Sequence, residues 1–439
     1  MNTKHIHCVI SLLWRPGEVW DKISEVMLRC KSFGFNRIRL GLVTGMLLAA
    51  GVLLWQTSTP LSATDKDIPK KPASTPAQPP SSPPSAPNNP AKPNQGFTYH
   101  HDVVSEVPWS IHVVKVDRSR SDLCLIPVLA RITNFGLAMV SQIVKSVPPE
   151  WGRPMAAING DYFFSVPNFY GEPMGLTIRD GEVLSSPGKD RACMWMDDKG
   201  NAYLTNFVTE FVVTWPNGVS IPVGLNEPRP PGTSVLYTST VGDSTFQLGG
   251  LEVVLERNGK DPWLPLRLGQ VLNARVKKIN TEGKTPLSPD YLVFSMSPQV
   301  ARQAPKVEVG QILKVNMATT PLVTNAVMAI GGGPSLVREG KPRPFEGLQL
   351  RHPRVAIGWN KTHFFMVVVD GRQAGLSVGM TLAELANYMI KLGCEYAMNL
   401  DGGGSTTMWV MGQVMNSPSL GHERPSANAL VLVRRAPKS

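Results

Sequence analysis

The segment best suited to chemistry is residues 399–407, which read Asn-Leu-Asp-Gly-Gly-Gly-Ser-Thr-Thr. An apolar run delivers Asp401, and three glycines and then hydroxyl residues follow it. Because glycine lacks a Cβ, backbone N–H groups in such a turn can converge on an anion. A flexible hairpin turn, the structural alternative, requires neither three glycines nor a flanking acid. The segment therefore predicts an anion site with Asp401 at its edge, formed with Asn399, Gly402, Gly403, Gly404, Ser405 and Thr406.

Two other apolar runs end in polar side chains or are interrupted by them. Asp370 closes one run, and Arg354 or Arg372 can hold a phosphate through two parallel hydrogen bonds. Taken alone, an Asp-Gly pair after a strand is typical of a turn. Asn159 and Asp161 interrupt the other run, where a β-bulge is the structural alternative. That these residues assemble around the glycine-rich turn is a hypothesis, because sequence spacing does not show it.

A serine hydrolase is a further interpretation. The sequence around Ser377 fits G-x-S-x-G, and Asp401 and His422 follow in the chain order of an α/β-hydrolase triad. The nucleophile of that pattern lies on a sharp turn between a strand and a helix. Here the preceding strand is predicted to end at Val369, and the next helix begins only after Thr381. The serine hydrolase is therefore the less favoured interpretation.

Short strands are expected to position most of these residues. Runs of β-branched and aromatic residues between Gly, Pro and Asn predict strands at 109–116, 123–129, 210–213, 251–255, 355–357, 364–369 and 396–400. One helix is predicted after Thr381, because Thr381 and Glu384 form a capping box and Gly393 supplies a stop. The pattern predicts an α+β fold of strand-rich mixed sheets with a few packed helices, and an inserted subdomain near 205–320.

The first 95 residues differ in character from the rest. An apolar run preceded by basic residues predicts a transmembrane signal anchor with the N-terminus in the cytoplasm; a cleaved signal peptide is the alternative. Residues 60–95 contain 11 prolines and predict an extended spacer. The expected organisation is a cytoplasmic tail (1–39), the anchor (40–57), a Pro-rich linker (58–95) and a catalytic domain (96–439). The last of these would be extracytoplasmic, in the periplasm or at the cell surface.

The charge balance argues against nucleic-acid binding. The net charge is +11, but residues 1–95, with 11 basic and 5 acidic residues, account for +6 and leave +5 for the rest. No basic run carries interleaved aromatic residues. The histidines lack the spacing typical of catalytic zinc. A hard cation such as calcium, held by oxygen atoms of Asp161, Asp370 or Asp401, stays open as a cofactor.

Taken together, these segments resemble the phosphodiester glycosidase family, whose animal relatives remove N-acetylglucosamine from phosphomannose on lysosomal enzymes. The most specific motif is the block at 399–406. The resemblance spans about 160–430, and its other blocks are 159–163, 171–181, 331–334, 352–358, 369–373, 377–382 and 416–428.

The resemblance implies a hydrolase that cleaves a sugar-1-phosphodiester of the N-acetylglucosamine type, on envelope or extracellular glycans, into a sugar and a phosphomonoester. An oxocarbenium-like transition state needs a carboxylate, and an acidic phosphate leaving group needs its charge neutralised. We therefore expect Asp401, Asp370 and Arg354 to be catalytic. The expected substrate-binding residues are Asn159, Asp161, Glu172, Arg372, Arg424 and the turn residues named above. A non-catalytic envelope glycan-binding module is the alternative.

Overall fold

The computed structural model describes residues 95–436. The predicted tail at 1–39, the anchor at 40–57 and the linker up to residue 94 lie outside the described residues. Within residues 95–436, no helix is both long and apolar enough to cross a membrane.

Four β-sheets make up most of the described chain, and all of their strand pairs except β11 with β12 are antiparallel. The first sheet has the order β1 (Phe97–Val104), β2 (Trp109–Asp117), β21 (His363–Val369), β20 (Arg354–Trp359), β22 (Tyr396–Asn399), β18 (Ser335–Arg338) and β19 (Lys341–Pro342). The second has the order β10 (Ser220–Pro222), β9 (Val208–Thr214), β16 (Ile312–Thr320), β14 (Val271–Asn280), β13 (Leu251–Arg257), β15 (Leu292–Met296), β12 (Ser234–Tyr237) and β11 (Gly224–Leu225).

The two smaller sheets have five strands each. One has the order β6 (Glu182–Ser185), β5 (Thr177–Arg179), β17 (Ala326–Gly332), β7 (Ala192–Asp197) and β8 (Ala202–Asn206). The other has the order β24 (Gln413–Val414), β23 (Met408–Val410), β4 (Arg153–Asn159), β25 (Asn428–Arg434) and β3 (Leu123–Leu129). The helices of the described residues are α4 (Val140–Ser146), α5 (Pro298–Gln303), α6 (Leu382–Lys391) and the short 3₁₀ turns η1 (Pro149–Trp151), η2 (Ser239–Val241) and η3 (Gly403–Ser405).

The strand-rich α+β prediction is confirmed, and each predicted strand coincides with an observed one. Helix α6 also begins where the capping box predicts. The Thr381 hydroxyl accepts a hydrogen bond from the Glu384 N–H, and the Glu384 carboxylate accepts one from the Thr381 N–H. Its apolar residues Leu385, Ala386 and Met389 are fully buried against the first sheet.

The direction of three central strands of the first sheet explains where the polar residues gather. Strands β21 and β22 both run antiparallel to β20. Their C-terminal ends therefore meet at the edge where β20 begins, with Arg354 at the start of β20 paired with Val369. Asp370 directly follows β21, and Asp401 follows β22 by two residues. All three predicted catalytic residues thus lie at one edge of the sheet.

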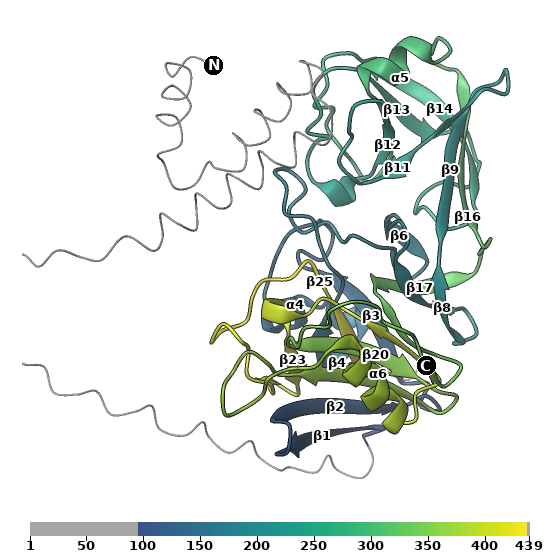
Figure 1. The fold of residues 1–439 in the computed structure, drawn as a ribbon. Coiled ribbons are helices and arrows are strands. Elements are labelled where there is room, and N and C mark those ends of the chain that lie inside the picture. Colours follow the sequence, from purple (N-terminus) through teal and green to yellow (C-terminus); the bar gives the residue numbers. More distant parts are fainter. Residues whose placement is uncertain (1–94, 437–439) are drawn as a thin grey trace, which may run out of the picture. The chain divides into compact units, whose positions relative to one another are not determined.

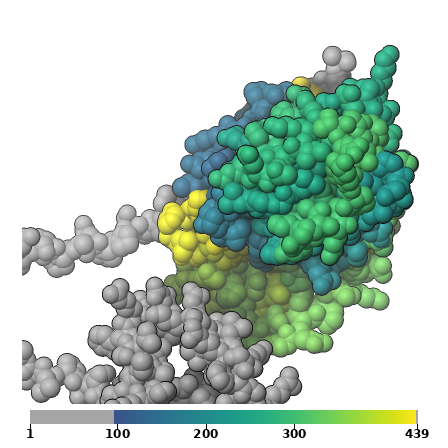
Figure 2. Space-filling view, turned by 90° about the horizontal axis from the view of Figure 1, so that it is seen from above, coloured from purple at the N-terminus to yellow at the C-terminus, as the bar shows by residue number. Residues whose placement is uncertain are grey.

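The eight-stranded sheet is built entirely from residues 208–320, the stretch in which the sequence predicts an inserted subdomain. Its strands β9, β13, β14 and β16 occupy the upper part of Figure 1, whereas β4, β20, β25 and α6 occupy the lower part. The view from above in Figure 2 shows this stretch as the teal and green atoms facing the reader. One face of the sheet buries large apolar side chains, among them Phe211, Trp215, Phe294 and Met317.

Candidate active site

Asp401 forms an ion pair with Arg424 at the edge of the first sheet. Oδ2 of Asp401 lies 3.0 Å from Nη2 of Arg424, and the Arg424 Nε donates to the Ser405 hydroxyl at 2.9 Å. The Asp401 residue is 7% exposed. Burial raises the pKa of its carboxyl group above the ordinary value, against the opposing effects of Ser405 and Arg424. Asp401 is thus a largely buried carboxyl group with one cationic partner.

The glycine-rich turn differs from the predicted anion nest. The N–H of Gly403 donates to the Pro353 carbonyl at 2.9 Å, and the N–H of Ser405 to the Gly402 carbonyl at 3.2 Å. These amide groups are engaged within the protein and do not converge on an empty site. The glycines instead permit close approach: a Cβ on Gly402 would lie 2.7 Å from the Pro353 oxygen, and Gly403 has a φ of +60°.

Arginine side chains surround this turn. A Cβ on Gly403 would lie 3.2 Å from Nη2 of Arg372, and a Cβ on Gly404 would lie 3.4 Å from the Arg424 side chain. Arg354 lies next to them in the fold, although its Nε and Nη2 already donate to the backbone carbonyls of Met380 (2.8 Å) and Leu350 (3.0 Å). Burial lowers the pKa of Arg354, and the positive charge of Arg372 acts in the same direction. The groups near the turn that could bind an anion are therefore arginine side chains and not backbone N–H groups.

Asn159 lies behind the turn and does not face a substrate, contrary to its predicted role. Its amide nitrogen donates to the Asp401 carbonyl at 2.6 Å, and its amide oxygen accepts from the Thr407 N–H at 3.0 Å. The residue is fully buried, so both amide atoms serve to hold the turn. Thr406 is also buried, and its carbonyl accepts a hydrogen bond from Asn416.

Tyr162 lies near Asp401 and near a second ion pair, between Arg191 and Asp161. The amide nitrogen of Asn399 donates to the Tyr162 hydroxyl at 2.9 Å, and burial together with the Asp401 charge raises the pKa of Tyr162. The Arg191 guanidinium lies 4.8 Å from the centre of the Tyr162 ring and donates to Oδ1 of Asp161 at 2.5 Å. Burial raises the pKa of Asp161 to about 6, against the opposing effect of Arg191. Asp161 is therefore bound to Arg191 instead of standing open to a ligand.

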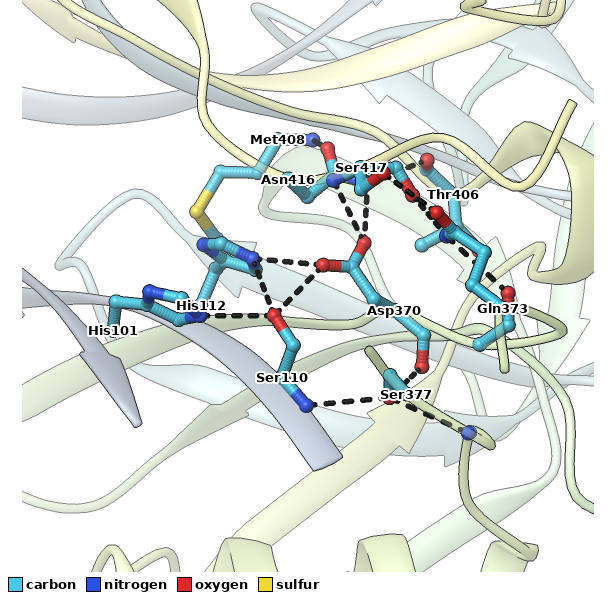
Figure 3. A network of polar contacts seen from close by, with 12 residues as sticks. His101, Ser110, His112, Asp370, Gln373, Ser377, Thr406, Met408, Asn416 and Ser417 are labelled. Carbon is cyan, nitrogen blue, oxygen red and sulfur yellow. Dashed lines mark hydrogen bonds and ion pairs between the residues drawn. The ribbon is translucent and has the colours of Figure 1, made fainter. Parts of the chain in front are cut away.

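Asp370, itself fully buried, lies at the centre of a separate network (Figure 3). Its Oδ2 accepts hydrogen bonds from the Ser110 hydroxyl at 2.9 Å and from Nε2 of His112 at 3.0 Å. Its Oδ1 accepts from the amide nitrogen of Asn416 at 3.1 Å and from the N–H of Ser417 at 2.9 Å. Both carboxylate oxygens are thus occupied, which leaves Asp370 little capacity to contact a substrate.

The Asp370 network nevertheless reaches the glycine-rich turn. Asn416 donates to both Asp370 and the Thr406 carbonyl, and its amide oxygen accepts from the N–H of Met408 at 2.7 Å. The Asn416 side-chain amide therefore holds the segment 406–408 at both ends, at the Thr406 carbonyl and at the Met408 N–H. This arrangement suits Asp370 to positioning the turn.

Ser377 does not form a nucleophilic triad. It is fully buried, and its hydroxyl donates to the Asp370 backbone carbonyl at 2.6 Å and accepts from the N–H of Ser110 at 3.2 Å. His422 is exposed on a loop and makes no hydrogen bond to Ser377. The hydroxyl is committed to the backbone, so this geometry does not favour a serine hydrolase.

The three aspartates proposed as cation ligands do not share one site. Asp161 pairs with Arg191, Asp401 pairs with Arg424, and Asp370 binds His112. Across residues 95–436 there is no group of three or more His, Cys, Asp or Glu side chains that could hold a metal ion.

Several residues at this site carry no local signal in the sequence. Tyr162 and Asn416 fall within motif blocks but have ordinary types for a strand end and a loop. Arg191 is isolated in sequence, and its contact with Asp161 spans 30 residues. Only the resemblance to related sequences could have indicated them. The remaining predicted residue, Glu172, lines a cleft to which Arg191 also contributes.

Comparison with known proteins agrees with this architecture. The phosphodiester glycosidase family model matches residues 269–433, which confirms the predicted resemblance over the stretch that contains Arg354, Asp401 and Arg424. An uncharacterized protein derived from the SPbeta prophage of Bacillus subtilis is 35% identical over 103 residues, covering 22% of this chain and 16% of that protein. The chain thus matches only a small part of that relative's length.

Two solved structures share the fold. A hypothetical protein from Synechocystis has a TM-score of 0.61 at 23% identity, over 77% of this chain and 62% of that one. A protein from Burkholderia pseudomallei has a TM-score of 0.57 at 22% identity, over 74% of both chains. At this level of identity the similarity concerns the fold alone.

Proposed function

We propose that this protein hydrolyses the glycosidic bond of a sugar-1-phosphodiester and releases a sugar and a phosphomonoester. The observation that carries the proposal is the Asp401–Arg424 pair at the glycine-rich turn, with Arg372 beside it. The match to the phosphodiester glycosidase family over this part of the chain supports a glycosidase-type hydrolase.

The chemistry requires an ionised carboxylate next to the anomeric carbon. Asp401 supplies it, either as a nucleophile or as a base that activates water. Burial raises the pKa of Asp401 and so makes the carboxylate more basic than an exposed aspartate, while Arg424 lowers this pKa and favours the ionised form. Removal of the substrate's phosphate needs little protonation, because a phosphomonoester is already an acidic leaving group.

The arginines neutralise the phosphate charge in this proposal. Arg372 and Arg424 present guanidinium groups next to Gly403 and Gly404, and a planar guanidinium can form two parallel hydrogen bonds with phosphate. Arg354 adds positive charge from the sheet edge while two of its donors stay bound to the backbone. Asp370 acts as a positioning residue through Asn416, and not as a group that touches substrate.

The substrate and the location are proposed from the sequence. The family resemblance favours N-acetylglucosamine as the sugar, and the predicted anchor and spacer favour glycans of the envelope or the extracellular space. The catalytic domain would then be tethered to the membrane and face away from the cytoplasm.

The test is a product assay with purified full-length protein and a defined N-acetylglucosamine-1-phosphodiester. We expect equal amounts of free sugar and phosphomonoester, and no product from the Asp401→Asn variant. Saturable binding without either product would instead support a glycan-binding module. Release of sugar-1-phosphate together with the free acceptor alcohol would contradict the proposed bond cleavage.

A further inference from the structure

A cleft of about 810 Å³ lies beside the candidate active site and is lined by three acidic residues, Glu172, Asp190 and Glu227. Its walls come from the stretches 164–191, 206–234 and Val300, and Arg191 is part of both the cleft and the Asp161 ion pair. The lining is largely apolar, with Phe207, Phe211 and Val223 among the contributing side chains. The acids Glu172 and Glu227 interrupt this apolar lining.

Glu172 is a buried carboxyl group without a partner. The residue is 2% exposed, and its Oε2 is buried with no hydrogen-bond donor among the described residues. Neither Glu172 nor Glu227 forms an ion pair with any Lys, Arg or His that the structure describes. An unpaired buried charge is costly, so a site of this kind needs either protonation or a bound cation.

The pKa values of both carboxyl groups are raised, and the charge of Glu227 contributes to the shift at Glu172. Burial raises the pKa of Glu172 to about 10, and the charge of Glu227 acts in the same direction. Burial also raises the pKa of Glu227 to about 7. The Glu227 carboxyl lies directly over Gly224, where a Cβ would come within 1.8 Å of its Oε1. At neutral pH Glu172 is therefore protonated and Glu227 is partly ionised, and a positively charged ligand would favour the ionised forms and displace protons.

The other charged and titratable groups around the pair do not neutralise it. Lys189, Asp190 and Arg191 line the cleft, and Arg191 is committed to Asp161. Lys189 and Asp190 are exposed at the rim. Burial raises the pKa of Tyr237, Arg229 opposes this, and Glu252, Glu172 and Glu227 add to it. The Arg229 guanidinium donates to Ser295 and to backbone carbonyls and not to either acid of the pair.

We propose that this cleft is a binding site for an organic ammonium group, such as the amine of an amino sugar, with Glu172 and Glu227 as its two acidic ligands. A calcium ion takes six to eight oxygen ligands, which two carboxyl groups in an apolar cleft do not supply. A neutral hydroxyl group would not offset the negative charge that Glu227, with a pKa of about 7, carries at neutral pH. An ammonium group offers charge and several N–H donors, and the apolar walls accommodate the carbon skeleton that carries it.

This proposal does not rest on the proposed hydrolysis, because binding is measured without turnover. The experiment is calorimetric titration of the purified full-length protein at pH 6 with glucosamine, N-acetylglucosamine and calcium chloride. We expect glucosamine to bind with net release of protons, seen as a difference in heat between buffers of different ionisation enthalpy. N-acetylglucosamine, which lacks the charge, should bind at least about tenfold more weakly.

Variants of the two acids test whether glucosamine binds in this cleft. Glu172→Gln and Glu227→Gln should each weaken glucosamine binding at least about tenfold. Asp190→Asn, which makes the same charge change at the rim of the same cleft, should leave the affinity unchanged. If Glu172→Gln does not fold, the proposal is still tested by Glu227→Gln and by the comparison of glucosamine with N-acetylglucosamine.

Several results would overturn the proposal. They are equal affinity for glucosamine and N-acetylglucosamine, calcium binding that Glu172→Gln abolishes, no amine binding at millimolar concentration, or an equal loss of affinity in Asp190→Asn. The first would indicate a neutral sugar site, the second a metal site, and the last a general electrostatic effect.

Discussion

Nη2 of Arg424 lies 3.0 Å from Oδ2 of Asp401, while the same guanidinium also contacts the Ser405 hydroxyl. The Asp401 side chain is 10% exposed and the Arg424 side chain 40%. A half-exposed pair of this kind contributes little to folding stability. Its main effect is therefore on the charge and orientation of the Asp401 carboxylate.

Replacing Asp401 by Asn should abolish most of the activity without unfolding the protein. The amide preserves the shape but removes the negative charge that a nucleophile or base requires. We expect kcat on a sugar-1-phosphodiester to fall by at least about a hundredfold. Thermal unfolding of the variant should stay close to that of the wild type, which separates loss of chemistry from loss of fold. Retention of most of the turnover would rule out Asp401 as the catalytic carboxylate.

The pH dependence of activity should reflect the raised pKa of Asp401. Because the carboxylate is the active form, kcat/KM should rise with pH through that pKa, at a higher pH than an exposed aspartate would give. Arg424 lowers this pKa, so Arg424→Gln should move the acid limb of the profile to still higher pH. Arg372→Gln serves as the comparison and should move the limb less. An unchanged limb in Arg424→Gln would show that another group controls it.

Arg372 and Arg354 should respond differently to replacement by lysine. Arg372 presents its guanidinium beside Gly403, so Arg372→Lys should raise KM for the phosphodiester about tenfold or more and leave Tm unchanged. Arg354 donates to two backbone carbonyls, so Arg354→Lys should also lower Tm. Steady-state kinetics and thermal unfolding of both variants test this. The same change in KM and Tm for both would contradict the separate roles.

Asp370→Asn should destabilise the fold. The carboxylate accepts four hydrogen bonds in a buried network (Figure 3), and an amide cannot accept all of them. We expect the free energy of unfolding to fall by at least about 2 kcal/mol, measured by urea denaturation. Asp190→Asn, an exposed acid with the same charge change, is the control. If Asp370→Asn is as stable as the wild type yet inactive, Asp370 contacts substrate after all.

Placement in the cell can be tested with protease on intact spheroplasts. The charge asymmetry around residues 40–57 and the Pro-rich spacer predict that the domain 96–439 lies outside the cytoplasmic membrane. Added protease should therefore degrade it, while a cytoplasmic marker protein stays intact. Full protection of the domain would contradict this placement.

Local patterns in the sequence were sufficient for much of the fold. The strands that end at Val369 and Asn399 and the helix capped by Thr381 rest on short-range effects: β-branched runs, a capping box and turn residues. They also indicated that Asp370 and Asp401 each follow a buried strand. These features need no knowledge of distant contacts, because each is set by residues within one element.

The assignment of partners to each acid was decided by the tertiary structure alone. Asp401 meets Arg424, Asp161 meets Arg191, and Asp370 meets His112 across 258 positions of sequence. Spacing along the chain shows neither which cation reaches which carboxylate nor which acid is already saturated with hydrogen bonds. Those distinctions depend on how sheets pack and how deeply each group is buried, because burial and a charged neighbour together determine whether a carboxyl group can act on a substrate.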